Sequence, residues 1–502
     1  MQISGRCAGL WAGKGQWKWV LACAVCLIRC DKPGDTWSVL LPRLGTHASP
    51  RAVDLTGDGV MDIVMGAGHN EFEKSDSAVV ALDGKTGALL WSAGGTDQIV
   101  SMPCFLDITG DQVPDVLIGG RRANFMALDG KTGAAIWRYT KPEPTDTGLF
   151  RFARFNFYTP QLIPDQTGDG LADILVTNGG NVYAQPGSTD HRYPGLLMVM
   201  DSKTGQVLRM TAMPDSAETY MSPLVGPGPE PGRLYVYVGT GGETIGGHLY
   251  RATLEEVLAG NLSDAEVLLA DTVQGFVAPP ILADLTGDGV PEVIAANHKG
   301  WLAAVNGRSG ALHWRVEVPG TEATISPAIG MFTRDSIPDF FINLSVGAWP
   351  ENLGGRQIAI DGQTGALIFQ DSIGCTGFYS PIVFDSDGDG LDEALISVND
   401  YNCFTTSMLD IEHYFAMYDP RTRQFEKFSV REAVKNISST PWAGDLDQDG
   451  YLDLVYCLQA NTTSILTFLG ISVTRYATSI KIRRPVRWGA YMGSNCDGIY
   501  HR

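Results

Sequence analysis

The sequence has few basic residues for its length. Its 502 residues include 37 lysines and arginines against 56 aspartates and glutamates, which gives a formal net charge of −19. A nucleic-acid-binding surface needs a basic stripe that neutralises phosphates, and the chain has no basic stretch of useful length. The composition therefore argues against a nucleic-acid partner.

Long hydrophobic runs are also missing. A membrane-spanning helix needs about 20 apolar residues, whereas the run near the N-terminus covers only residues 20–28 and follows three basic residues. This pattern is typical of an export signal, so we expect residues 1–30 to be a leader. One form is a lipoprotein leader in which Cys30 or Cys23 is acylated, and the other is a leader that is simply cleaved. Both predict an extracytoplasmic protein, either secreted or anchored by lipid at the outer membrane or cell surface.

The cysteines do not form a recognisable framework. Five lie beyond the leader, an odd number at wide spacings. Such spacing defines no disulfide pattern, and whether Cys375 and Cys403 pair is left open.

A repeat occurs eight times along the chain. Each copy begins with a proline, usually preceded by serine or threonine, and the mean spacing is about 56 residues. These prolines are Pro50, Pro103, Pro160, Pro223, Pro280, Pro327, Pro381 and Pro441. After most of them come an acidic loop such as DLTGDGVMD, an apolar strand and a turn such as ALDGKTGALLW.

Each repeat predicts four short strands. One strand follows the proline, one follows the acidic loop, one enters the DGKTG turn and one leaves it toward the tryptophan. Four strands in about 56 residues match a propeller blade. We therefore expect an all-β protein with a single eight-bladed β-propeller over residues 31–470, its blades starting near residues 48, 101, 158, 221, 278, 325, 379 and 439. Residues 471–502 depart from the repeat and are expected to form a C-terminal extension or to help close the ring.

Six of the acidic loops have the spacing of a calcium loop, with oxygen ligands at alternate positions and a carboxylate at the ninth. Oxygen donors without histidine or thiolate favour Ca²⁺, so about six Ca²⁺ sites are expected between the first two strands of the blades. The expected ligands are Asp54, Thr56, Asp58, Asp62; Asp107, Thr109, Asp111, Asp115; Asp165, Thr167, Asp169, Asp173; Asp284, Thr286, Asp288, Glu292; Asp385, Asp387, Asp389, Glu393; and Asp445, Asp447, Asp449, Asp453. Calcium occupancy is left open at the loop with Gln112 in place of glycine and at the worn loop of the sixth repeat, near residue 331.

These loops account for most of the net charge. They contain 20 of the 56 acidic residues, which leaves 36 acids against 37 basic residues elsewhere. The acidity therefore predicts bound ions more directly than it predicts a basic partner.

Together the two motifs resemble known propeller families. The acidic loops resemble FG-GAP repeats of integrin α-subunits, and the AxDxxTGxxxW units resemble the repeats of quinoprotein-like propellers. The resemblance implies the fold and calcium ligation by the loop residues. Quinoprotein dehydrogenases hold pyrroloquinoline quinone (PQQ) with an adjacent cysteine pair, which this chain lacks, so no PQQ is expected. A lipid-anchored ring of this kind also resembles outer-membrane lipoproteins that act as scaffolds.

The face opposite the calcium loops is expected to bind a ligand. Its longest link combines aromatic and arginine side chains, a composition typical of binding hot spots. The candidates are Phe150, Arg151, Arg154, Phe155 and Tyr158. We expect a monomeric binding or scaffold module for a protein or glycan, without catalysis of its own.

An enzyme is the alternative. Eight-bladed calcium propellers include polysaccharide lyases, which need a cationic or histidine base, and a PQQ-dependent dehydrogenase is a more distant possibility. Four histidines fall near the loops of that face, at His69, His191, His248 and His298, but their spacing forms no catalytic constellation.

Overall fold

A computed structural model describes residues 35–140, 148–185, 187–349, 351–403, 411–429, 432–460 and 468–501. The expected leader, with Cys23 and Cys30, lies outside these residues. No helix in the described ranges is long and apolar enough to cross a membrane.

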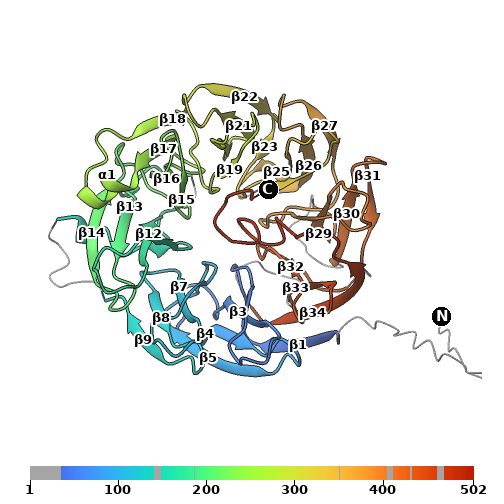
Figure 1. The fold of residues 1–502 in the computed structure, drawn as a ribbon, viewed down its shortest axis with the longest axis horizontal. Coiled ribbons are helices and arrows are strands. Elements are labelled where there is room, and N and C mark those ends of the chain that lie inside the picture. Colours follow the sequence, from blue (N-terminus) through green and yellow to red (C-terminus); the bar gives the residue numbers. More distant parts are fainter. Residues whose placement is uncertain are drawn as a thin grey trace, which may run out of the picture. The chain divides into compact units, whose positions relative to one another are not determined.

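Eight antiparallel sheets are arranged as blades around a central axis (Figure 1). This confirms the predicted eight-bladed, all-β propeller. Blade one contains β2 (Arg51–Val53), β3 (Asp62–Gly66), β4 (Ser75–Leu82) and β5 (Leu89–Gly95), and blade two contains β6 (Cys104–Leu106), β7 (Asp115–Gly119), β8 (Phe125–Leu128) and β9 (Ala135–Arg138). Blade three contains β10 (Asn156–Phe157), β11 (Gln161–Ile163), β12 (Asp173–Gly179), β13 (Leu196–Met200) and β14 (Val207–Ala212). Blade four contains β15 (Leu224–Pro227), β16 (Leu234–Gly239), β17 (Gly247–Thr253) and β18 (Glu266–Asp271).

The remaining blades follow the same order. Blade five contains β19 (Ile281–Ala283), β20 (Glu292–Asn297), β21 (Trp301–Val305) and β22 (Leu312–Glu317), and blade six contains β23 (Thr321–Glu322), β24 (Ala328–Gly330), β25 (Asp339–Ala348), β26 (Glu351–Ile360) and β27 (Leu367–Asp371). Blade seven contains β28 (Ile382–Phe384), β29 (Glu393–Asp400), β30 (Glu412–Asp419) and β31 (Gln424–Lys427). Blade eight contains β32 (Trp442–Gly444), β33 (Tyr451–Gln459), β34 (Gly470–Lys481) and β1 (Trp37–Pro42). In the described residues, two short helices, η1 (Gly148–Arg151) and α1 (Leu254–Ala259), lie between strands.

The hydrophobic pattern explains why the blades stack. The second strands are apolar on both faces, and all five residues of β3 and of β7 are buried. The outer strand β5 instead alternates between exposed and buried residues. A sheet that is apolar on both faces must be covered on both, and only a neighbouring blade on each side does this.

Tryptophans at the ends of the repeats join successive blades. The indole Nε1 of Trp91 donates a 2.7 Å hydrogen bond to the carbonyl oxygen of Gly130, in the DGKTG turn of the next blade. A Cβ on Gly130 would lie 2.0 Å from the Pro114 oxygen, and one on Gly133 would lie 2.7 Å from the Trp91 ring. Gly133 is therefore needed for the turn to pack closely against the ring of the preceding blade, and Gly130 for it to pack against Pro114 of its own blade.

The ring closes between the two ends of the propeller sequence. Strand β1 pairs with β34 along its whole length, from Trp37 opposite Arg475 to Pro42 opposite Gly470. The indole Nε1 of Trp37 donates a 2.8 Å hydrogen bond to the Gly84 oxygen of blade one. Trp91 makes the equivalent bond from blade one to Gly130 of blade two. Residues 470–481 thus form the third strand of blade eight, and the propeller extends past the expected boundary at residue 470.

The segment after β34 fills the inside of the ring, where the C-terminus lies in Figure 1. The innermost strands of three blades bond to its backbone: Val383 N donates to Trp488 O at 2.8 Å, Ala443 N to Gly489 O at 2.6 Å and Leu282 N to Gly498 O at 2.8 Å. Trp488 is buried there at 1 % exposure. We call residues 482–501 the tail.

A disulfide joins Cys375 to Cys403. It answers the pairing that the sequence left open. Among the described residues, Cys104, Cys457 and Cys496 are free thiols.

Candidate functional site

A central cavity of about 520 Å³ opens on one face of the ring. It is lined by the links between blades and by the loops between second and third strands. The lining residues include His47, Arg121, Tyr158, Arg192 and Trp349. None of the acidic loops contributes to this lining. Since each first strand runs from a link to an acidic loop, the cavity lies on the face opposite those loops.

The base of the cavity is built from hydroxyl groups and the tail. The Ser49 hydroxyl accepts a 3.0 Å bond from Thr440 N, and the Thr440 hydroxyl accepts one of 2.9 Å from Ser380 N. Serine or threonine before the repeat proline therefore links one blade to the next. Tyr491 from the tail also lines the cavity. The tail therefore forms part of the floor of the cavity, beside these hydroxyl groups.

One wall contains a buried charge cluster around Arg192. Its Nη1 lies 2.9 Å from Glu218 Oε1, 3.5 Å from Glu243 Oε1 and 2.7 Å from the Tyr220 hydroxyl. Glu218 has no exposed surface. Burial raises its pKa to about 7 despite the nearby Arg192 charge. Arg192, Tyr220 and Glu243 face the cavity, whereas Glu218 supports them from behind.

The Glu218 carboxyl should make stability depend on pH. Its pKa in the fold is about 7 against an ordinary value of 4.5, so its contribution is most favourable at low pH and is lost as pH rises through 7. Between pH 4.5 and 8 the free energy of unfolding of the wild type should fall by about 3 kcal/mol relative to Glu218→Gln. Urea unfolding across this range measures the difference, and the exposed Glu230→Gln is the control. Parallel profiles for wild type and Glu218→Gln would contradict the expectation.

A second wall contains Arg121, His47 and Ser438. Arg121 forms an ion pair with Glu71. His47 Nδ1 lies 2.7 Å from the Ser438 hydroxyl, and burial together with the Arg121 charge lowers the pKa of His47 to about 3. A neutral imidazole therefore touches a hydroxyl inside the cavity.

The sequence did not indicate these cavity residues. They come from separate loops and share no repeat position. The four histidines considered as bases, at positions 69, 191, 248 and 298, do not line the cavity. His248 instead pairs with Asp215 at 2.7 Å, and His298 lies 3.5 Å from Glu322.

The five ligand-face candidates are divided between separate places. Tyr158 lines the central cavity, Arg154 lines an outer groove and Phe150 lines a third hollow beside β14. Phe155 is buried and stacks on Tyr193 with ring centroids 5.5 Å apart. Arg151 lies over the Phe152 ring at 4.5 Å. These residues do not form a single surface.

The acidic loops form on the opposite face, and their first and ninth positions organise the backbone. Asp54 accepts bonds from Gly57 N at 2.7 Å and Gly59 N at 3.1 Å. The buried Asp62 accepts from Leu55 N at 2.9 Å and, through its other oxygen, from Gly84 N at 3.0 Å. The ninth-position acid thus joins its own loop to the DGKTG turn.

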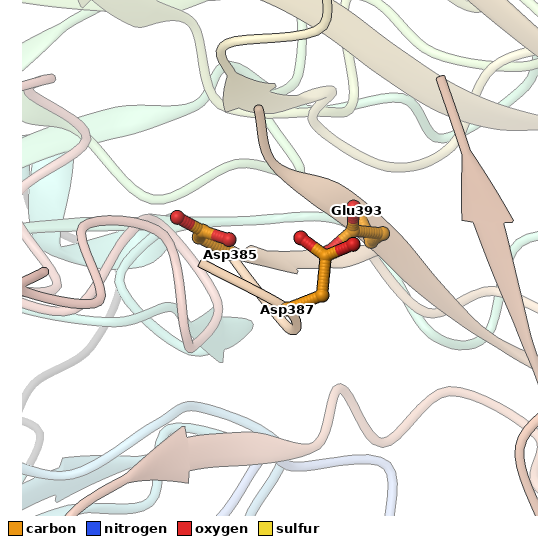
Figure 2. Close-up of side chains that lie close together, drawn as sticks. All are labelled: Asp385, Asp387 and Glu393. Atoms are coloured by element: carbon orange, nitrogen blue, oxygen red, sulfur yellow. The ribbon is translucent and has the colours of Figure 1, made fainter. Parts of the chain in front are cut away.

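Two of the loops bring three carboxylates together. Asp385, Asp387 and Glu393 offer oxygen atoms within 4.8 Å of one another (Figure 2), as do Asp445, Asp447 and Asp453. The four loops with threonine at the third position contain no such group of three acids among the described residues.

The two clusters differ in their surroundings. In the loop at 445, Arg475 is 1 % exposed and lies between two acids, with Nη2 2.5 Å from Asp447 and Nε 3.0 Å from Asp453. In the loop at 385, Glu393 Oε1 is buried without a hydrogen-bond partner. Asp447 Oδ1 in the loop at 445 is buried without a hydrogen-bond partner too. Arginines also reach the loop at 385, where Arg484 lies 2.9 Å from Asp385 and Arg421 lies 2.7 Å from Asp387. The difference is at the ninth position, because Asp453 pairs with Arg475 whereas Glu393 forms no ion pair in the described residues, and an unpaired buried carboxylate beside other acids fits a hard cation.

Comparisons with known proteins agree with the fold. The FAM234A/B beta-propeller family model matches residues 60–222, less than half of the chain. No curated protein matches the sequence.

Solved structures match over most of the chain. The quinohemoprotein alcohol dehydrogenase ADHIIG from Pseudomonas putida HK5 is 14 % identical, with a TM-score of 0.55 over 91 % of this chain and 78 % of that one. A europium-containing methanol dehydrogenase is 14 % identical, with a TM-score of 0.51 over 89 % and 93 %. BamB from Moraxella catarrhalis is 14 % identical, with a TM-score of 0.46 over 88 % and 96 %. At such identities the dehydrogenase matches show that the chain shares the propeller fold, and they leave its activity to be argued from its own residues.

Proposed function

We propose that this protein is a binding or scaffold module whose protein or glycan ligand enters the central cavity. The observation that carries the proposal is a preformed cavity of about 520 Å³ with a polar wall and a floor supplied by the tail. Concave, preformed sites with a few placed polar groups are where ligands bind most often. The charged side chains there are already paired within the protein, which suits recognition more than proton transfer.

Binding should depend on the aromatic rim of the cavity. Trp349 lines it with 39 % of its surface exposed and packs edge-on against Phe378 at 5.7 Å. For a ligand found on arrays of glycans and extracellular proteins, Trp349→Ala should weaken binding about tenfold or more. Tyr476→Ala removes an aromatic side chain of similar exposure, 41 %, on β34 away from the cavity, and should leave affinity unchanged. Equal affinity in both variants would place the ligand elsewhere.

A carbohydrate-active enzyme remains the second candidate. The contact between His47 and Ser438 inside the cavity is the observation in its favour. A turnover assay on pectic polymers separates the two functions, because product release that is lost in His47→Gln would establish catalysis and overturn a pure binding role.

We further propose that the acidic loops hold Ca²⁺ as a structural ion, with the cluster at Asp385, Asp387 and Glu393 the best suited. At dissociation constants of about 0.1–1 mM, millimolar Ca²⁺ stabilises the fold by roughly 0.4–1.4 kcal/mol per site. Excess EDTA should therefore lower the melting temperature by several degrees, and Ca²⁺ but not Mg²⁺ should restore it. Asp387→Asn should reduce the response to EDTA. An unchanged midpoint in EDTA would contradict calcium binding.

We also propose an extracytoplasmic location for this module. The disulfide between Cys375 and Cys403 is of the kind that persists in oxidising compartments. We propose a secreted or lipid-anchored monomer without PQQ.

A further inference from the structure

A second concave site lies outside the central cavity. This outer groove, of about 880 Å³, is lined by four exposed basic side chains: Lys74, Arg122, Arg138 and Arg154. They come from the loop before β4, the β7–β8 turn, the end of β9 and the segment after η1. Among the described residues that line it, the single acid is Asp76. A positively charged groove on a chain of net charge −19 is unexpected from composition alone.

The four cations keep their charge available. In the described ranges, none of them forms an ion pair with a carboxylate within 4.0 Å. Arg138 Nη1 donates to the Gly94 oxygen at 2.8 Å. Arg154 lies over the rings of Phe155 at 5.4 Å and Tyr193 at 5.6 Å. These contacts orient the guanidinium groups without neutralising them, so an anion in the groove would meet preplaced donors.

The β7–β8 turn that presents Arg122 is held in an unusual conformation. Arg122 and Ala123 both have positive φ, at 53° and 58°. Side chains other than glycine rarely adopt this region, at about 1–2 kcal/mol per residue. Asn124 holds the turn, since its Oδ1 accepts from Thr96 Oγ1 at 2.9 Å and its Nδ2 donates to Arg121 O at 2.7 Å. The turn thereby puts Arg121 in the central cavity and Arg122 in the groove.

Aromatic side chains border the same groove. Tyr139 and Tyr183 line it. Tyr183 is 61 % exposed and stacks on Phe72, which is 41 % exposed, with centroids 5.3 Å apart. Large exposed rings are costly unless they contact something, and a flat ring of this kind offers apolar area beside a polar edge.

We propose that the outer groove binds an acidic polysaccharide, with the four cations contacting its carboxylates or sulfates and Tyr183 packing against a sugar ring. A concave groove admits a single extended chain but not a flat anionic bilayer. The net charge of −19 repels a long nucleic acid at distances beyond the groove, whereas a short acidic segment meets mainly the local cations. The site is separate from the central cavity, so it stands or fails independently of the function proposed there.

Fluorescence anisotropy with end-labelled oligosaccharides tests the proposal. The probes are a sulfated heparin dodecasaccharide, a dodecamer of galacturonic acid and a neutral maltododecaose. At low salt one or both acidic probes should bind and the neutral one should not, and added salt should weaken binding. Preference between the two acidic probes distinguishes sulfate from carboxylate recognition. Absence of binding by both acidic probes would overturn the proposal.

Variants separate the groove from general charge attraction. Arg122→Gln with Arg138→Gln should lower affinity at least tenfold. The control pair, Arg233→Gln with Arg356→Gln, removes the same charge on blades four and six and should have little effect. Tyr183→Ala should also weaken binding, which simple ion exchange would not show. Equal loss in both charge pairs, or tighter groove-dependent binding of dT12 or of anionic phosphatidylserine vesicles, would refute an acidic-polysaccharide site. Unchanged melting temperatures establish that the variants fold.

Discussion

Trp488→Ala should lower the free energy of unfolding by about 3–5 kcal/mol, the range for removing a large buried aromatic side chain. Trp488 is 1 % exposed and belongs to the core cluster shared by blades five to seven. Its backbone oxygen accepts from Val383 and that of Gly489 accepts from Ala443. Emptying this position removes apolar contacts with several innermost strands at once, and urea unfolding measures the loss.

Trp349→Ala is the matched control. It makes the same substitution at a tryptophan that is 39 % exposed, so the expected change is about 1 kcal/mol or less. Equal losses in the two variants would show that the tail contributes no more to stability than the cavity rim does. Because Tyr491 lies on the same tail and lines the central cavity, Trp488→Ala should also weaken ligand binding there.

Arg475→Met should destabilise the protein by about 3–5 kcal/mol, because breaking a buried ion pair leaves its partner charges uncompensated. Arg475 contacts Asp447 at 2.5 Å and Asp453 at 3.0 Å, and its Nη1 reaches Gly84 O of blade one at 3.3 Å. Loss of the guanidinium therefore affects both the acidic loop at 445 and the closure between blades eight and one. Thermal and urea unfolding measure the effect.

Arg421→Met controls for the charge change. Arg421 lies 2.7 Å from Asp387, but its side chain is 46 % exposed, and exposed pairs contribute about 0–1 kcal/mol. Calcium adds a second comparison: without the guanidinium, the loop at 445 should be stabilised more by Ca²⁺ than it is in the wild type. A small loss in Arg475→Met, with no added response to Ca²⁺, would contradict the role assigned to Arg475.

The repeated parts of the fold were predictable because they depend on nearby residues. The DGKTG turns require glycine at Gly130 and Gly133, and the aromatic partner Trp91 recurs at the end of the repeat. A serine or threonine before most of the repeat prolines was visible in the sequence, and the structure shows that hydroxyls at Ser49 and Thr440 link neighbouring blades. Calcium ligation by the loops stays a prediction.

The candidate sites were much less predictable. The cavity side chains Arg192 and Tyr220 come from two different loops, one between β12 and β13 and the other joining blades three and four. The outer groove likewise combines Lys74 and Arg154, 80 residues apart in the sequence. Loops on this face vary from blade to blade, so the period that revealed the strands carries no information about them.

By itself the sequence determined the number of blades, their four-stranded plan and the position of the acidic loops, because each depends on spacing within one repeat. Only the tertiary structure decided how the ring closes and what occupies its centre. Strand β1 meets β34 more than 400 residues later, and the tail reaches Leu282, Val383 and Ala443 in three blades. Such contacts arise from burial of surfaces that no single repeat can cover, so they follow from the closed ring rather than from any local pattern.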